Sequence, residues 1–154
     1  MTDALARIQA VIAPWCGEVP LTVRKGSGGE AGFTTSWHPL FARGDDVTEY
    51  IEIGLARPAD HPATRAVVLH ECAHILQYRA YGYDWAALDS AMRHVYPDGP
   101  HSPVEHMADC MSEVMGAERQ GRSDDGQWYG TGYGGSCSPQ QLDAAAQVVD
   151  GRRL

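Results

Sequence analysis

Hydrophobic and polar positions in the first third of the chain follow two different periods. Apolar residues recur at helical spacing from 5 to 12, which predicts a first helix that ends before Pro14. Residues 19–23 and 33–37 are short runs on either side of a glycine-rich turn, and both predict extended segments. Residues 47–55 alternate apolar and polar side chains most regularly. The pattern therefore predicts one helix followed by three strands.

The rest of the pattern is mostly helical. A helix that begins after its cap residue Asp60 and ends before Gly82 is apolar on almost every face, so we expect it to be buried. The sequence then predicts helices at 85–96, 103–120 and 138–149, and a long irregular loop at 122–135 that is rich in glycine. Many helices beside a few strands predict an α+β fold.

Composition limits the class of protein. The chain has 154 residues, of which 44% are hydrophobic, and this is enough for one core, so we expect residues 1–154 to form a single domain. A formal net charge of -8 repels polyanions and argues against a nucleic-acid partner. No run approaches the roughly 20 apolar residues that a membrane span needs. We therefore expect neither a nucleic-acid nor a membrane partner.

The first residues of the chain and its cysteines indicate the cellular compartment in which the protein works. The first residues show no export signal, so a cytoplasmic location is the default expectation, with secretion left open. Cys16, Cys72, Cys110 and Cys137 form no C-x-x-C pair. In a reducing compartment we expect buried free thiols, and a disulfide between the first and the last of these cysteines, Cys16 and Cys137, is the alternative.

His70, Glu71 and His74 form a His-Glu-x-x-His pattern inside the helix that we expect to be buried. The two histidines lie about 40° apart around the axis and one turn along it, so both imidazoles can bind one cation. Glu71 can then reach a water molecule on the metal without being a ligand. Burying three ionisable side chains costs free energy unless a bound cation offsets the loss of their hydration. The alternative is that this short motif occurs by chance on a core helix that binds no metal.

A catalytic zinc site needs a third protein ligand, and a later helix offers one. Glu105 and Asp109 lie one turn apart on the same face, so Glu105 can bind the metal while Asp109 accepts the outer N–H of a ligating histidine. The alternative is that Glu105 only caps its helix together with Ser102. Less favoured third ligands are His101, His106 and Glu113.

Two segments resemble the gluzincin metallopeptidases, and most closely the bacterial neutral zinc metallopeptidases. HECAHILQ at residues 70–77 is similar to the helix that carries two zinc-binding histidines in that family. EHMADC at residues 105–110 is similar to the helix that supplies a glutamate and, four residues later, an aspartate. The resemblance spans about residues 47–120. It implies a helix-rich, zincin-like domain with a small antiparallel sheet packed on the histidine-bearing helix.

The resemblance also implies that the chain binds one Zn²⁺ and hydrolyses peptide bonds in a peptide or protein substrate. Residues 49–55 would then form the edge strand along which an extended peptide lies. Zinc activates water, and Glu71 takes its proton and passes it to the leaving amine. Candidates for stabilising the oxyanion are Tyr129, Tyr133, His101 and Tyr83.

Two other functions are compatible with the same residues. A zinc-bearing binding or regulatory module can keep the fold and the metal without turning over peptides. Glu71 favours chemistry, because a structural zinc site has no need for a carboxylate beside the water position. A metal-free helical protein is the third reading, and it predicts no bound zinc.

Overall fold

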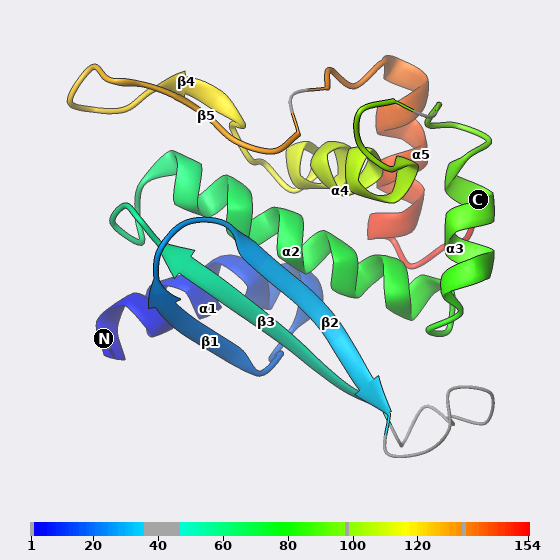
Figure 1. Ribbon diagram of the computed structural model, residues 1–154, viewed down its shortest axis with the longest axis horizontal. Coiled ribbons are helices and arrows are strands. Elements are labelled where there is room, and N and C mark those ends of the chain that lie inside the picture. The colour runs from blue at the N-terminus through cyan, green and yellow to red at the C-terminus, as the bar shows by residue number, and fades with distance from the viewer. Residues whose placement is uncertain (1, 36–46, 98, 134) are drawn as a thin grey trace.

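The computed structural model describes residues 2–35, 47–97, 99–133 and 135–154, and across them it contains five helices and five strands (Figure 1). The predicted α+β class is confirmed. None of the helices in these ranges is long and apolar enough to cross a membrane. In chain order the elements are α1 (Thr2–Cys16), β1 (Leu21–Lys25), β2 (Gly29–Thr35), β3 (Val47–Leu55), α2 (Pro62–Ala80), α3 (Trp85–Met92), α4 (Pro103–Val114), β4 (Gln120–Arg122), β5 (Trp128–Gly130) and α5 (Pro139–Val149).

Strands β1, β3 and β2 form a mixed sheet in that order. β1 runs parallel to β3, with Leu21 opposite Ile51, whereas β2 runs antiparallel to β3, with Ala31 opposite the same isoleucine. The expected antiparallel pairing is therefore wrong for β1 and β3. β3 lies in the centre, so the expectation that residues 49–55 form an edge strand is also wrong, and β2 takes an edge beside α2. Alternating side chains reveal the two faces of a strand but not its neighbours.

Helix α2 is the centre of the fold. It packs against α1, β2 and β3 on one side and against α4 and α5 on the other (Figure 1). Its residues are buried almost without interruption from Ala63 to Tyr78, as the apolar pattern predicts. The cap is His61 rather than Asp60, because the His61 side chain accepts the hydrogen bond from the Ala63 N–H. This central position gives α2 neighbours on every side.

The segments after α2 differ from the predicted elements in three places. α3 ends at Met92, with Arg93 as its C-cap, rather than at residue 96. α4 ends at Val114 rather than near residue 120, because Gly116 adopts a left-handed φ of 88° and stops the helix. The segment predicted as an irregular loop at 122–135 contains β5, which pairs antiparallel with β4. The last two residues of the extended segment predicted at 33–37 lie outside the described residues.

The cysteines form two disulfides. Cys16 is bonded to Cys72, which joins α1 to α2, and Cys110 is bonded to Cys137, which joins α4 to the segment before α5. The predicted free thiols are therefore wrong, and so is the alternative pairing of the first with the last cysteine. Which sulfurs meet depends on how the helices pack, and the spacing of cysteines along the chain does not contain that information.

Candidate metal centre

Three side chains meet between α2 and α4. His70 and His74 come from successive turns of α2, and Glu105 comes from the first turn of α4. The two histidine Nε2 atoms are 3.1 Å apart, and Glu105 Oε2 lies 3.1 Å from Nε2 of His70 and 3.2 Å from Nε2 of His74. Tetrahedral ligands about 2.0–2.1 Å from a zinc ion are themselves separated by about 3.3 Å. These three atoms, hereafter the donor cluster, thus have the spacing of zinc ligands.

The outer nitrogen of each histidine is held by a hydrogen-bond acceptor. His70 Nδ1 lies 2.8 Å from Asp109 Oδ1, and His74 Nδ1 lies 2.9 Å from Gln77 Oε1. The amide of Gln77 is itself oriented, because its Nε2 donates to the carbonyl oxygen of Val104 at 3.0 Å. Both Nδ1 atoms therefore carry protons, and in neutral rings both Nε2 atoms present lone pairs to the cluster.

The electrostatics of the cluster call for a positive charge at its centre. Burial opposes charge on His70, but hydrogen bonds to Asp109 and Glu105 raise the pKa of this histidine to about 9. Burial likewise opposes charge on Glu105, yet hydrogen bonds to the two histidines lower the pKa of its carboxyl well below the usual range. Three lone pairs face one another, so either a shared proton or a cation must lie between them. A divalent cation can satisfy all three at once.

Glu71 lies beside the cluster without belonging to it. The residue is 6% exposed, and burial raises the pKa of its carboxyl, although nearby His70 and His74 work in the opposite direction. Its side chain lies against the backbone of Gly29 at the start of β2: a Cβ atom there would be 2.6 Å from Glu71 Cγ. Only glycine leaves room for the carboxylate in this position.

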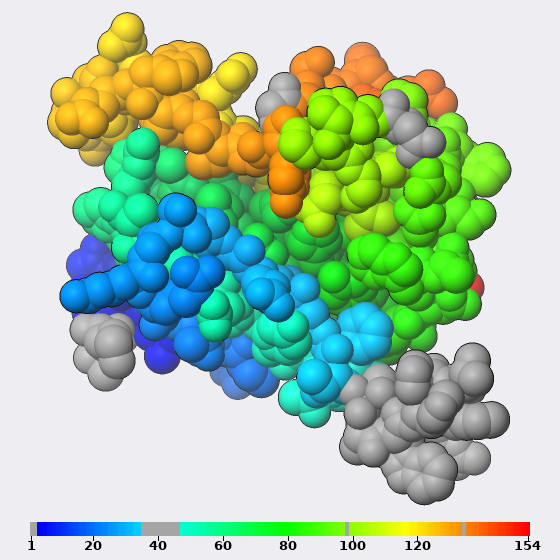
Figure 2. Space-filling model, in the orientation of Figure 1, coloured from blue at the N-terminus to red at the C-terminus, as the bar shows by residue number. Residues whose placement is uncertain are grey.

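Glu71 and His70 line a cavity of about 190 Å³, hereafter the Glu71 cavity. Its walls come from Gly28 and Gly29 at the start of β2, from the first half of α2, and from the segment from Thr131 to Tyr133, and Asp109 and Arg119 complete the lining. In Figure 2, green atoms of α2 are visible between the blue atoms of β2 and the orange atoms that follow β5. The Glu71 cavity therefore lies between this strand and that segment.

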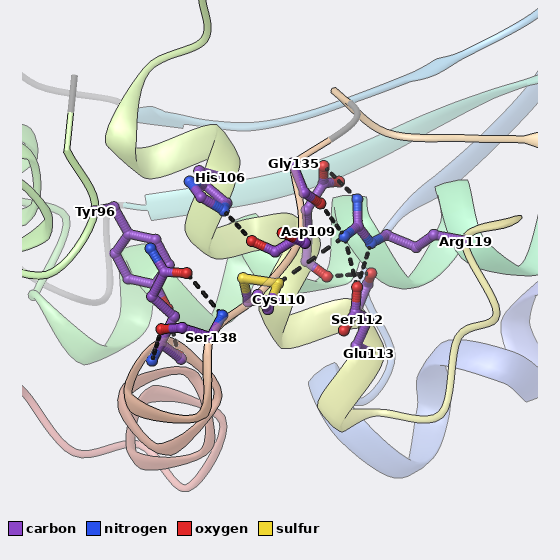
Figure 3. Close-up of a disulfide and its surroundings, with 12 residues drawn as sticks. Tyr96, His106, Asp109, Cys110, Ser112, Glu113, Arg119, Gly135 and Ser138 are labelled. Carbon is purple, nitrogen blue, oxygen red and sulfur yellow. Dashed lines mark hydrogen bonds and ion pairs between the residues drawn. A yellow bond between two sulfur atoms is a disulfide. The ribbon is translucent and has the colours of Figure 1, made fainter. Parts of the chain in front are cut away.

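Asp109 is fixed by the chain that follows α4. Arg119 donates from Nη1 to Asp109 Oδ2 at 3.0 Å, and the backbone N–H of Tyr133 donates to the same oxygen at 2.9 Å. Arg119 also donates to Glu113 Oε1 at 2.7 Å and to the carbonyl oxygen of Gly135 (Figure 3). The guanidinium thus connects the carboxylate that orients His70 to the segment that lines the Glu71 cavity.

Ligand and cap are compatible roles for Glu105. The Ser102 hydroxyl accepts a hydrogen bond from the backbone N–H of Glu105 at 3.3 Å, so the cap exists. The Glu105 side chain nevertheless points to the two histidines rather than back to the helix start. The other third-ligand candidates lie elsewhere: His106 contacts the carbonyl oxygen of Ser136, Glu113 pairs with Arg119, and His101 packs on Tyr133.

Two of the four oxyanion candidates lie near the cluster. The ring centroid of Tyr133 is 5.8 Å from that of His70, and the ring of His101 is 4.3 Å from that of Tyr133. Burial and the negative charges of Glu105 and Glu71 raise the pKa of Tyr133, so its hydroxyl stays protonated and able to donate. The geometry therefore favours Tyr133 over His101, which stands behind it.

The other two oxyanion candidates lie away from the cluster. Tyr129 is buried in β5, where its ring contacts His61 at 5.4 Å between centroids. The hydroxyl of Tyr83 donates to Glu49 Oε1 at 2.9 Å, in a polar group that includes Arg79. Neither tyrosine lines the Glu71 cavity.

Sequence reasoning assigned no role to Gln77 or Arg119. Gln77 follows His74 by three residues, which is the spacing of a helical contact, so the sequence carried a local signal for it. Arg119 carried no such signal, because its approach to Asp109 depends on the turn that ends α4. Comparisons of the chain with protein-family models, with curated proteins and with solved structures found no match.

Proposed function

We propose that this protein is a zinc-dependent peptidase of the gluzincin type that binds one Zn²⁺ per chain. The observation that carries the proposal is the spacing of the donor cluster next to the buried carboxylate of Glu71. The resemblance of residues 70–77 and 105–110 to gluzincin motifs supports the same reading. His70, His74 and Glu105 would hold the ion and leave a coordination position facing the Glu71 cavity.

In this proposal each residue has a separate task. Zinc, when bound, polarises the scissile carbonyl and lowers the pKa of a neighbouring water molecule. Glu71 accepts a proton as water adds to the carbonyl carbon, and it then donates that proton to the leaving amine nitrogen. Asp109 and Gln77 keep both imidazoles in the orientation that presents Nε2. Tyr133 donates from its hydroxyl to the developing oxyanion.

The substrate in this proposal is a peptide in extended conformation. β2 pairs with β3 along one side only, and its other side has no strand partner among the described residues, so a further strand could add there. The start of this strand lies against Glu71, and Tyr78 on α2 donates to the carbonyl oxygen of Ala31 at 3.4 Å. An added peptide strand would therefore pass the carboxylate that is to act on it.

The substitution Glu71→Gln tests the proposal most directly. It removes the proton acceptor but keeps the size of the side chain, so cleavage of a mixed peptide library should fall about 10²- to 10⁴-fold. Elemental analysis should still find one zinc per chain. The exposed Glu18→Gln variant, which loses the same charge far from the cluster, serves as the control. Zinc binding without any cleavage by the unmodified protein would instead favour a non-catalytic zinc module.

We also propose that the protein works in an oxidising compartment rather than in the cytoplasm. Two disulfides support this location, because reducing compartments keep most thiols unpaired. Intact mass measured without reductant should be four mass units below that of the reduced chain, about one for each hydrogen lost. Recovery of the fully reduced mass from the native compartment would contradict this location.

A further inference from the structure

The Glu71 cavity continues into a second, larger cavity of about 370 Å³, hereafter the Arg57 cavity. The two share four lining residues: Gly28, Val67, Thr131 and Gly132. The second cavity lies at the N-terminal end of α2, where the end of β3 and the end of β5 face the first turns of the helix. A chain that leaves Glu71 in this direction therefore passes from one cavity into the other.

The lining of the Arg57 cavity is small and carries one charge. Glycine and alanine form much of the wall, and Ser27 and Thr64 supply hydroxyl groups. Arg57 is the sole charged side chain among the described residues that line it. No carboxylate in the described part of the chain forms an ion pair with this guanidinium. Its charge is thus available to a bound molecule.

Among the residues that the structure describes, one side chain lies within hydrogen-bonding distance of Arg57, and it does not satisfy the guanidinium. Arg57 Nη1 lies 3.2 Å from Nε2 of His61. Nδ1 of the same imidazole accepts the backbone N–H of Ala63 at 3.0 Å, so in the neutral ring Nε2 carries the proton. Two N–H donors therefore lie side by side, and no acceptor in the described part of the chain lies between them. A carboxylate is the acceptor that suits such a pair.

The direction of the bound peptide follows from the sheet. β2 begins at Gly29, beside Glu71, and Gly28 immediately before it lines both cavities. Antiparallel pairing is the more stable arrangement for an added strand, and a peptide antiparallel to β2 runs from the end of that strand toward its start. The residues after the scissile bond would then enter the Arg57 cavity.

We propose that the Arg57 cavity binds a carboxylate of the substrate on the C-terminal side of the scissile bond, and that Arg57 determines this specificity. The inference rests on the proposed peptidase function. The carboxylate belongs either to an acidic side chain or to a free C-terminus. The net charge of -8 disfavours acidic peptides in general, so a preference for them must arise locally.

The test compares kcat/KM for matched peptides. In the first comparison the peptide is amidated at its C-terminus and carries either Glu or Gln at one of the two positions after the cleaved bond, with each position tested in turn. In the second comparison a neutral peptide has either a free or an amidated C-terminus. In at least one of these comparisons we expect the unmodified protein to prefer the peptide that carries the carboxylate by about threefold to fivefold, which is the upper part of the range for an exposed ion pair. In Arg57→Gln this ratio should fall to about one, and in Arg57→Lys part of it should return.

A matched control is the exposed Arg65 on α2, which does not line the cavity. Arg65→Gln removes the same charge nearby and should leave the preference intact. An equal loss of preference in both variants would mean that only the general field matters, and it would overturn the inference. Thermal unfolding of each variant shows whether it is folded.

Binding to the Glu71→Gln variant separates this inference from the peptidase proposal. Fluorescence anisotropy with labelled acidic and neutral peptides measures recognition without turnover. Cleavage without any acidic preference would overturn the Arg57 assignment and leave the peptidase proposal standing. If acidic peptides bind in a way that depends on Arg57 but the unmodified protein cleaves none of them, the peptidase proposal fails and the Arg57 assignment stands. Preference confined to residues before the scissile bond would also overturn the inference.

Discussion

At the scale of single residues, the orientation of the two imidazoles depends on side chains that do not touch the candidate ion. Gln77 holds Nδ1 of His74, and its amide cannot turn over without losing the carbonyl oxygen of Val104. Asp109 holds Nδ1 of His70 in the same way. Such outer contacts fix both the tautomer and the direction of the ring. The geometry of the donor cluster therefore depends on Gln77 and Asp109, which contact the histidines from outside the cluster.

Gln77→Leu should weaken zinc binding by about 10- to 100-fold, because His74 loses the acceptor that directs its Nε2 toward the cluster. Competition with a chromophoric chelator measures the affinity. Gln140→Leu, an exposed position at the start of α5, is the matched control and should bind zinc as the unmodified protein does. An affinity that Gln77→Leu leaves unchanged would remove this role from the residue.

Gly29→Ala should reduce peptide cleavage by about tenfold or more while zinc content stays at one per chain. The added Cβ would lie 2.6 Å from Glu71 Cγ and 2.7 Å from Oε1, so the carboxylate must move away from its place. Small displacements of a catalytic group have large effects on rate. Gly99→Ala, where a Cβ meets nothing within 4 Å, is the control. Full activity of the Gly29 variant would contradict the assigned position of the base.

At the scale of elements, the segment from Thr131 to Cys137 is bound to α4 by contacts of different kinds. The Cys110–Cys137 disulfide holds its far end, and Arg119 accounts for contacts with Asp109 and with Gly135 (Figure 3). The same segment supplies one wall of the Glu71 cavity. Loss of the disulfide therefore bears on both the ligand geometry and the cavity.

Replacing Cys110 and Cys137 together by alanine should lower both the melting temperature and the affinity for zinc. The bond closes a chain separation of 27 residues, for which the expected stabilisation is about 2–4 kcal/mol. Replacing Cys16 and Cys72 together is the comparison, because that bond joins α1 to α2 and leaves α4 untouched. It should lower the melting temperature and reduce zinc affinity less, because it leaves the contacts of Arg119 with Asp109 and Gly135 in place. Equal zinc affinities in the two double variants would contradict this distinction.

The sequence predicted what depends on neighbours along the chain. Helical spacing alone places His70 and His74 on one face of a helix, and it does the same for Glu105 and Asp109. In the structure the members of each pair do lie on one face of their helix. The pairing of β1 with β3 and the two disulfides depend on contacts between distant segments, for which local periodicity has no signal. The helices were therefore predicted better than the sheet.

At the scale of the whole molecule, the candidate ion would connect two separate parts of the core. Its two candidate histidine ligands lie on α2, the centre of the fold, and the candidate ligand Glu105 lies on α4, which packs on α2 from the other side. The ion would therefore act as a cross-link that exists only in the folded chain. A ligand of this kind stabilises the native state in proportion to the logarithm of its concentration.

Zinc at about 100 times its dissociation constant should add about 2.7 kcal/mol to the free energy of unfolding. For a chain of this size that corresponds to a rise of roughly 5–10 °C in melting temperature. Differential scanning fluorimetry with and without a chelator measures the change. Glu105→Ala should lose most of the rise, whereas Glu71→Gln should keep it. The same melting temperature with and without zinc would contradict a metal bridge between the two helices.

The hydrogen bonds from Asp109 and Gln77 have one more consequence, for how the protein would acquire its ion. Both imidazoles are held in place by groups of the chain itself, so the conformational entropy of fixing them is lost during folding and not at capture. Loading would then require the departure of a proton and of hydration water but no rearrangement of the backbone. A nascent chain could complete its folding first and be metallated afterwards.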